Sequence, residues 1–130
     1  MAKVLKSRYG LGEIASKTAD EYDLSAVVAL GAGKDYVLDV VTWRWGFWYE
    51  GVFDVSKYLV LYEARLRFIE VKTATVLAEG LCIYDWKKAG KALVSYDQLL
   101  ANDAAVVKSH LAESVDHCTD HYAATLFNNT

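Results

Sequence analysis

The stretch YLVLYEARLRFIEVKTATVLAEGLCIYD, residues 58–85, decides the fold because it contains two strand patterns joined by a short turn. In its first half, every second residue is apolar and the set forms one face: Tyr58, Val60, Tyr62, Ala64, Leu66 and Phe68. The intervening positions carry Glu63, Arg65 and Arg67, as expected of a strand with one face in a core. The segment KTAT, Lys72 to Thr75, is short enough to reverse the chain, so the two halves predict an antiparallel hairpin.

The second half of this hairpin carries mostly small side chains on one face. They are Val76, Ala78, Gly80, Cys82 and Tyr84. Because small residues let another element approach closely, this face predicts a helix packed above the strand. Upstream, the β-branched and aromatic residues of 36–49 predict a further strand. We expect its Tyr36, Leu38 and Val40 to face the same helix layer.

The C-terminal part of the chain has the period of an amphipathic helix. Ser95 followed by Gln98 has the spacing of a capping box, and Asn102 or Asp103 offers a second cap further along. Apolar residues recur at steps of three and four and form one stripe: Leu100, Ala104, Val107, Leu111, Val115, Cys118, Tyr122 and Leu126. We expect this stripe to lie across the sheet.

A shorter segment, 24–30, has two interpretations. Asp23 or Ser25 is a suitable helix cap, and Gly31 or Gly33 a suitable helix end, which favours a short helix. The same residues also fit one arm of a hairpin that turns at GAGK, residues 31–34.

Together these patterns predict an α+β fold in which a three- or four-stranded antiparallel sheet packs against helices in two layers. A length of 130 residues is typical of one domain, so we expect residues 1–130 to form a single domain. Within it, residues 1–34 are expected to be a lead-in with a short helix. Residues 35–130 are expected to supply the sheet and the long C-terminal helix.

The composition argues against two classes of function. The 14 Lys and Arg residues and 17 Asp and Glu residues are interspersed, with a net charge of −3, so we expect no nucleic-acid partner. No apolar stretch reaches the roughly 18 to 20 residues that a membrane-spanning helix needs, because Asp39, Arg44 and Glu50 interrupt the longest candidate. The first residues lack the pattern of a secretion signal, so we expect that any signal was removed or never existed.

The two cysteines are expected to meet. Cys82 falls on the small face of the third strand and Cys118 on the apolar stripe of the last helix, so both point into one interface. A bond between them closes a loop of about 36 residues and stabilises the fold by about 4 kcal/mol in the chain-entropy model. Such a bond persists in an oxidising compartment. The alternative is a pair of buried free thiols in a cytosolic protein.

Three motifs carry a resemblance to a known group of proteins. They are WGF at Trp45–Phe47 after the first strand, V-L-A-E-G-x-C at Val76–Cys82, and a late helix with a second cysteine at Cys118. Over about Asp35 to Phe127, the chain resembles bacterial exported proteins and lipoproteins of uncharacterised function, which usually have a T-G-K turn where this chain has VKTATVLAEG. The resemblance implies a periplasmic or cell-envelope location, with a lipoprotein-like precursor, and a sheet backed by helices.

The opposite face of the sheet is predicted to be the functional one. One helix layer covers one face only, whereas both faces are apolar by this pattern, so the second is expected to bind protein, with a homodimer as the main expectation. The predicted interface residues are Trp43, Trp45, Phe47, Arg65, Arg67, Leu77, Leu81 and Ile83. We expect Arg65 and Arg67 to lie across Trp43 and Trp45 in cation–π contacts. The alternatives are that residues 1–34 cover this face, or that the tryptophans form a cradle for a carbohydrate or small ligand.

A second class of function involves the last helix. His110, His117 and His121 lie on one side of it, and His117 with His121 has the i, i+4 spacing that can chelate zinc, with Asp103 or Asp120 as further ligands. Metal binding by these histidines is therefore the alternative function.

No G-x-S-x-G nucleophile motif occurs, and GAGK lacks the spacing of a phosphate-binding loop. We therefore predict a protein that is not an enzyme and has no cofactor.

Overall fold

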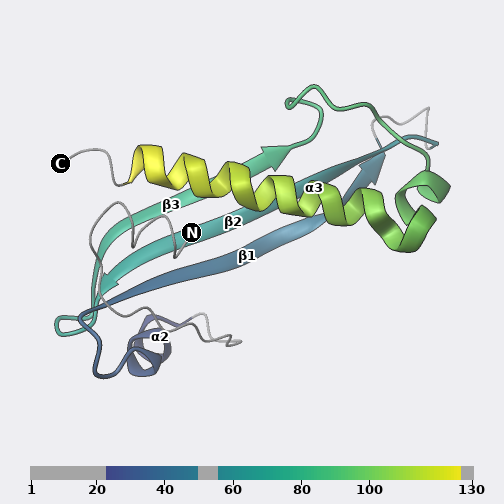
Figure 1. Cartoon of the computed structure of the whole chain (residues 1–130). Coiled ribbons are helices and arrows are strands. Elements are labelled where there is room, and N and C mark those ends of the chain that lie inside the picture. Colours follow the sequence, from purple (N-terminus) through teal and green to yellow (C-terminus); the bar gives the residue numbers. More distant parts are fainter. Residues whose placement is uncertain (1–22, 50–55, 127–130) are drawn as a thin grey trace.

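The computed structural model describes residues 23–49 and 56–126, which form one sheet and two helices (Figure 1). Its elements are α2 (Leu24–Leu30), β1 (Tyr36–Tyr49), β2 (Tyr58–Glu70), β3 (Thr75–Asp85) and α3 (Tyr96–Thr125). The described strands form a three-stranded antiparallel sheet in the order β1-β2-β3, so the predicted α+β class is confirmed. The lead-in over residues 1–22 and the connection over 50–55 lie outside the described residues.

The long helix α3 runs across one face of the sheet, which we call the inner face (Figure 1). The opposite face is called the outer face below. On the inner face, the predicted alternation of β2 holds: Val60, Tyr62, Ala64 and Leu66 are all buried. Their partners on β3 include Cys82 and Tyr84, which are buried in the same cluster. The core therefore lies between the sheet and α3.

The short segment 24–30 is a helix, so the hairpin alternative is wrong. The Asp23 carboxylate accepts hydrogen bonds from the backbone N–H groups of Ser25 and Ala26, which caps the helix N-terminus. A hydrogen bond from the Ser25 hydroxyl, together with these two backbone bonds, lowers the pKa of Asp23. The helix ends at Gly31, as the sequence predicts.

The long helix α3 begins with the predicted capping box. The Ser95 hydroxyl accepts a bond from the Gln98 N–H, and the Gln98 side chain accepts one from the Ser95 N–H. The helix is then interrupted over residues 101–104, where Asn102, Asp103 and Ala104 have left-handed backbone angles. A short first segment and a long second segment therefore run in different directions, as the bend at the N-terminal end of α3 in Figure 1 shows. Leu99 of the first segment and Val107 of the second pack in the same part of the core.

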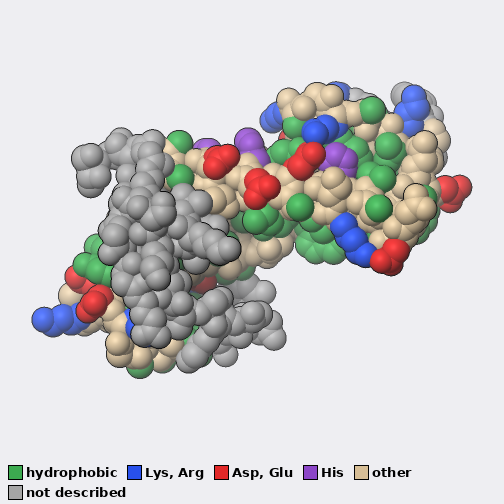
Figure 2. Space-filling model, in the orientation of Figure 1, with side chains coloured by type: hydrophobic (Ala, Val, Ile, Leu, Met, Phe, Trp, Pro, Cys, Tyr) green, Lys and Arg blue, Asp and Glu red, His purple; other side chains and the backbone are tan. Residues whose placement is uncertain are grey.

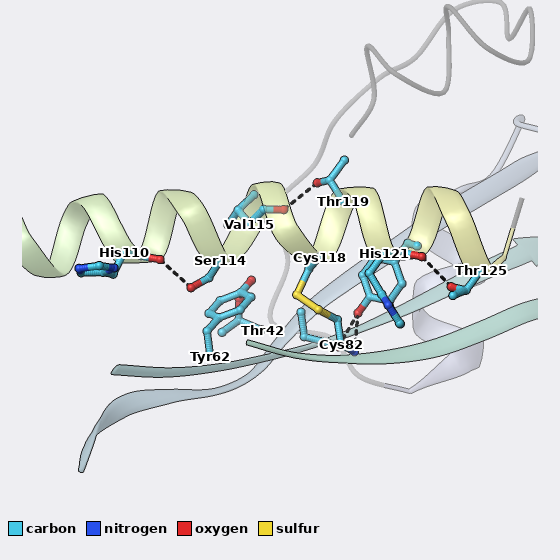
Figure 3. The surroundings of a disulfide bond; sticks show 12 residues. Thr42, Tyr62, Cys82, His110, Ser114, Val115, Cys118, Thr119, His121 and Thr125 are labelled. Atoms are coloured by element: carbon cyan, nitrogen blue, oxygen red, sulfur yellow. Dashed lines mark hydrogen bonds between the residues drawn. A yellow bond between two sulfur atoms is a disulfide. The ribbon is translucent and has the colours of Figure 1, made fainter. Parts of the chain in front are cut away.

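The predicted apolar stripe of α3 is wrong at two positions. Leu100 and Val115 are nearly half exposed, while Leu99, Ser114 and Thr119 are buried. The interruption at 101–104 rotates the first segment relative to the second, which accounts for the burial of Leu99 in place of Leu100. Within the second segment, Ser114 and not Val115 faces the core. The hydroxyl groups of Ser114 and Thr119 find hydrogen-bond partners within the helix. Ser114 donates to the His110 carbonyl and Thr119 donates to the Val115 carbonyl (Figure 3).

The predicted disulfide is present and joins the two layers. Cys82 of β3 is bonded to Cys118 of α3, with a Cα–Cα distance of 5.6 Å and 36 residues of sequence separation (Figure 3). Beside it, the buried Tyr122 hydroxyl donates to the Ala64 carbonyl and accepts from the Cys82 N–H at 3.2 Å. Burial raises the pKa of Tyr122 to about 12, so the phenol stays protonated and able to donate. One tyrosine thus links α3 to both β2 and β3.

Candidate association surface

A bulge in β1 determines which aromatic residues reach the outer face. Thr42 pairs with Ala64, and Arg44 pairs with Glu63, which leaves Trp43 without a partner on β2. Thr42 is on the inner face, where its hydroxyl lies 3.1 Å from the Tyr62 hydroxyl. Trp43 and Arg44 both belong to the outer face, because Trp43 contacts Arg65 and Arg44 forms an ion pair with Glu63.

The bulge turns Trp45 and Phe47 to the inner face, so their predicted place on the outer face is wrong. Trp45 is paired with Tyr62, and Phe47 with the buried Val60. Phe47 packs against the second part of the core, which is formed by residues including Trp86 and Leu99. The two rings of Trp45 and Phe47 meet edge to face with their centroids 6.3 Å apart. Phe47 therefore helps α3 dock, through its contact with Tyr96, and Trp45 lies beside it at the exposed edge of the inner face.

The sequence contains a signal for this bulge. If β1 alternated strictly from Tyr36 onward, Arg44 and Gly46 would point into the core together with Trp48. A charged side chain and a glycine are poor core residues, and this conflict is removed by one extra residue before Arg44. The same signal identifies Trp48 as an outer-face residue, which the sequence-based prediction missed.

The outer face keeps a patch of large exposed side chains. Trp43, Leu77, Leu81 and Ile83 are each exposed by more than half. Arg65 and Glu79 lie among them, since Arg65 pairs with Leu81 and Glu79 pairs with Arg67 in the sheet register. We call the following set the association surface: Trp43, Arg65, Leu77, Glu79, Leu81 and Ile83. Five of these residues were predicted as interface residues; Glu79 was not.

Two tryptophans of the outer face make cation–π contacts, and the first of these contacts lies within the association surface. The Arg65 guanidinium carbon lies 5.5 Å from the centroid of the Trp43 ring, as predicted. The second contact differs from the prediction: Arg44, and not Arg67, lies over a tryptophan, with its guanidinium carbon 5.5 Å from the Trp48 ring. The ion pair with Glu63 raises the pKa of Arg44. Trp43 and Trp48 are each held against the sheet by the cation–π contact with their arginine.

Arg67 is not available for an interface. Its guanidinium binds the Asp39 carboxylate, with Nη2 and Nε at 2.7 and 2.8 Å from Oδ2, and both side chains are about nine-tenths buried. Asp39 of β1 and Arg67 of β2 lie directly opposite each other in the sheet register. Arg67 therefore stabilises the sheet from its outer face, and only Arg65 remains as a cation within the association surface.

Helix α2 covers one end of the outer face. Gly31 lies so close to Val37 that a Cβ at Gly31 would sit 2.2 Å from Cγ2 of Val37, and Val71 is also adjacent. Val27 of α2 is buried. Helix α2 thus covers the Val37 end of the outer face but not Trp43 or Leu81, which are more than half exposed. Most of the segment in the alternative that residues 1–34 cover this face, residues 1–22, lies outside the described residues. The association surface remains exposed beyond α2.

The three histidines are separated by their aromatic partners. His110 stacks on Trp86 with centroids 3.9 Å apart, His117 meets Tyr84 at 5.3 Å, and His121 meets Tyr122 at 5.8 Å. Across the described parts of the chain, no group of three or more His, Cys, Asp or Glu side chains is arranged to hold a metal ion. The alternative function of metal binding by His110, His117 and His121 therefore receives no support from their geometry.

His110 belongs to a small network of ionisable groups on the α3 side of the molecule. Its Nδ1 is buried, 3.5 Å from Glu113 Oε2, and burial lowers the pKa of His110. Glu113 also accepts hydrogen bonds from Lys91 and Tyr84, at 3.0 and 3.1 Å, and the Lys91 bond lowers the pKa of Glu113. Figure 2 shows this side of the molecule, where acidic side chains lie along the exposed surface of α3.

Comparison with family models, with curated proteins and with solved structures finds no match for this chain. Within residues 23–49 and 56–126, no helix has the length and apolar character that a membrane span requires. Among the described residues, the disulfide between Cys82 and Cys118 and the exposed apolar patch on the outer face are features that bear on function.

Proposed function

We propose that this chain is a non-catalytic domain of the bacterial cell envelope that acts by associating with a second copy of itself through the association surface. The observation that carries the proposal is the exposure of Trp43, Leu77, Leu81 and Ile83 on one sheet face, each by more than half. Burying one such side chain is worth about 1.5–3 kcal/mol, so a partner that covers all four gains substantial binding energy.

A homodimer is favoured over a different partner by the charges of this surface. In a two-fold symmetric contact the same patch meets itself, so the patch has to carry its own complement. The association surface contains one cation, Arg65, and one anion, Glu79, on neighbouring strands. A surface of a single sign would repel its copy, whereas this one is self-complementary.

The envelope location is supported by chemistry and by sequence motifs. The Cys82–Cys118 disulfide joins sheet and helix, and disulfides persist where the environment is oxidising, as in the bacterial periplasm. The motifs at Trp45–Phe47 and Val76–Cys82, which resemble those of exported bacterial proteins and lipoproteins, point the same way. Of the two carboxylates on neighbouring strands that could serve acid–base chemistry, Glu63 is engaged by the Arg44 guanidinium.

Two tryptophans of β1 provide a matched test of the association. Trp43 and Trp45 are both more than half exposed but lie on opposite faces because of the bulge. We expect the wild-type protein to sediment as a dimer and Trp43→Glu to raise the dimer Kd by about 30-fold or more, the effect of losing an interface hot spot. Trp45→Glu, on the inner face, should keep the wild-type Kd.

The measurement is sedimentation velocity over a wide range of protein concentrations, with far-ultraviolet circular dichroism to verify folding. Leu81→Glu serves as a second outer-face variant, since Leu81 is half exposed and its replacement leaves the core intact. A wild-type protein that stays monomeric at every concentration would refute the proposal. So would a Trp45→Glu variant that dissociates while the Trp43→Glu variant does not.

A further inference from the structure

Arg65 has hydrogen-bonding capacity that its own chain leaves unused. Two of its guanidinium nitrogens, Nε and Nη2, are buried and have no hydrogen-bond partner. Within the described residues, Glu79 forms an ion pair with Arg65, and its Oε1 lies 3.9 Å from Nε, which is beyond a hydrogen bond. A buried donor without an acceptor is costly, and more so when it is charged. A carboxylate in better geometry than Glu79 offers here would therefore stabilise Arg65.

A carboxylate from outside the chain can reach these buried nitrogens once the half-exposed Glu79 side chain, whose Oε1 lies 3.9 Å from Nε, turns aside. Trp43, Arg65, Glu79, Gly80 and Leu81 line a surface pocket of about 520 Å³ on the outer face. Nε and Nη2 form one edge of the guanidinium, the geometry that binds both oxygens of a carboxylate. The Trp43 ring lies against the guanidinium, which limits access of water and strengthens an ion pair formed there.

The outer face itself carries the matching carboxylate. The Glu79 side chain is half exposed, so it is able to rotate away from its own Arg65. In the sheet register Arg65 pairs with Leu81 and Arg67 with Glu79, which makes Arg65 and Glu79 diagonal neighbours on adjacent strands. A two-fold axis passing between them places each Arg65 against the Glu79 of the other copy.

We infer that Arg65 and Glu79 exchange partners when two copies associate, so that two reciprocal Arg65–Glu79 ion pairs fix the register of the dimer. The inference rests on the proposed self-association and names the residues that make it specific. The apolar side chains of the association surface supply burial, whereas the exchanged pairs select a second copy of the same chain over other apolar surfaces.

Charge reversal tests this exchange. Arg65→Glu gives a surface with two acids, and Glu79→Arg one with two bases, so each variant repels its own copy. We expect each to raise the homodimer Kd at least about 30-fold, since loss of one member of a desolvated pair costs that much or more. An equimolar mixture of the two should form a one-to-one heterodimer with a Kd near that of the wild type, and the double variant R65E/E79R should again form homodimers.

Controls separate this inference from the proposed function. Lys108→Glu reverses a charge on α3, where Lys108 pairs with Asp103 at 2.5 Å and is mostly exposed, and it should leave the dimer Kd unchanged. Arg65→Gln removes the charge with little change in shape and should weaken the dimer if Arg65→Glu fails to fold. A dimeric wild type whose two reversal variants keep the wild-type Kd overturns the exchange and leaves the association standing. A monomeric wild type overturns both.

Discussion

Ala74, in the turn between β2 and β3, has a left-handed backbone with φ of 51°. This conformation costs a residue with a Cβ about 1–2 kcal/mol, and glycine adopts it freely. We therefore expect Ala74→Gly to raise the free energy of unfolding by about 1 kcal/mol, although it makes the unfolded chain more flexible. Urea unfolding followed by circular dichroism measures the change.

The control for this prediction is the same substitution in a helix. Ala112 is an exposed residue of α3 outside the interruption at 101–104, and glycine at such a position lowers stability by about 1 kcal/mol. The two variants should thus shift stability in opposite directions. Equal losses in both would contradict the left-handed conformation of Ala74.

His110 makes stability depend on pH. Burial lowers its pKa below 6.5 in the folded chain, so the unfolded chain binds a proton more readily than the folded chain does. The free energy of unfolding is therefore at its full value above about pH 6.5 and decreases as the pH falls towards the lower pKa of the folded state. The groups beside His110 are Glu113 and Lys91, which act in opposite directions on its pKa.

Replacing His110 isolates this effect. We expect His110→Gln to flatten the decrease in unfolding free energy between about pH 7.5 and 5.5, measured by urea unfolding at several pH values. This window lies above the titration of Glu113, whose pKa is lowered from 4.5. An unchanged profile in the His110 variant would show that the histidine is not desolvated.

At the scale of elements, the disulfide is the covalent connection between α3 and the sheet. Replacing both Cys82 and Cys118 with alanine opens a loop of 36 residues, and we expect a loss of about 4 kcal/mol in unfolding free energy from the entropy of that loop. Urea unfolding with and without reductant measures it: the wild type should fall to the level of the double variant on reduction, and the double variant should not respond. A wild type that alkylates fully without reductant would disprove the bond.

The elements themselves were largely predictable, and the errors have local causes. Alternation over residues 58–85 predicts β2, β3 and their hairpin because one sheet face is buried. The caps at Asp23 and Ser95 were predictable because the side chains bond to backbone within three residues. Strict alternation did not predict the face on which Trp45 lies, because the bulge adds one residue to β1 and moves the residues after it to the opposite face. The burial of Leu99 was missed because the backbone leaves the helical region a few residues later.

At the scale of the whole molecule, the two faces of the sheet are covered unequally. Helix α3, fastened by Tyr122 and the disulfide, covers the β2 and β3 part of the inner face, where Val40 and Trp45 of β1 stay about half exposed. Helix α2 covers the Val37 end of the outer face. The excess of apolar surface was predictable from composition and alternation alone. Its position was predictable only in part, because the buried Asp39–Arg67 pair and the bulge at Trp43 depend on which residues of neighbouring strands come opposite each other.

The bulge also means that Trp43 is dispensable for the architecture of β1. Thr42 and Arg44 already pair with the successive residues Ala64 and Glu63, so deletion of Trp43 would join them in an uninterrupted ladder without turning any other side chain over. Phe47 would stay in the core. Deletion of this one residue would therefore remove the aromatic ring that covers Arg65 and would leave the fold intact. The surface around Arg65 can thus change during evolution by a one-residue deletion in β1 as well as by substitution.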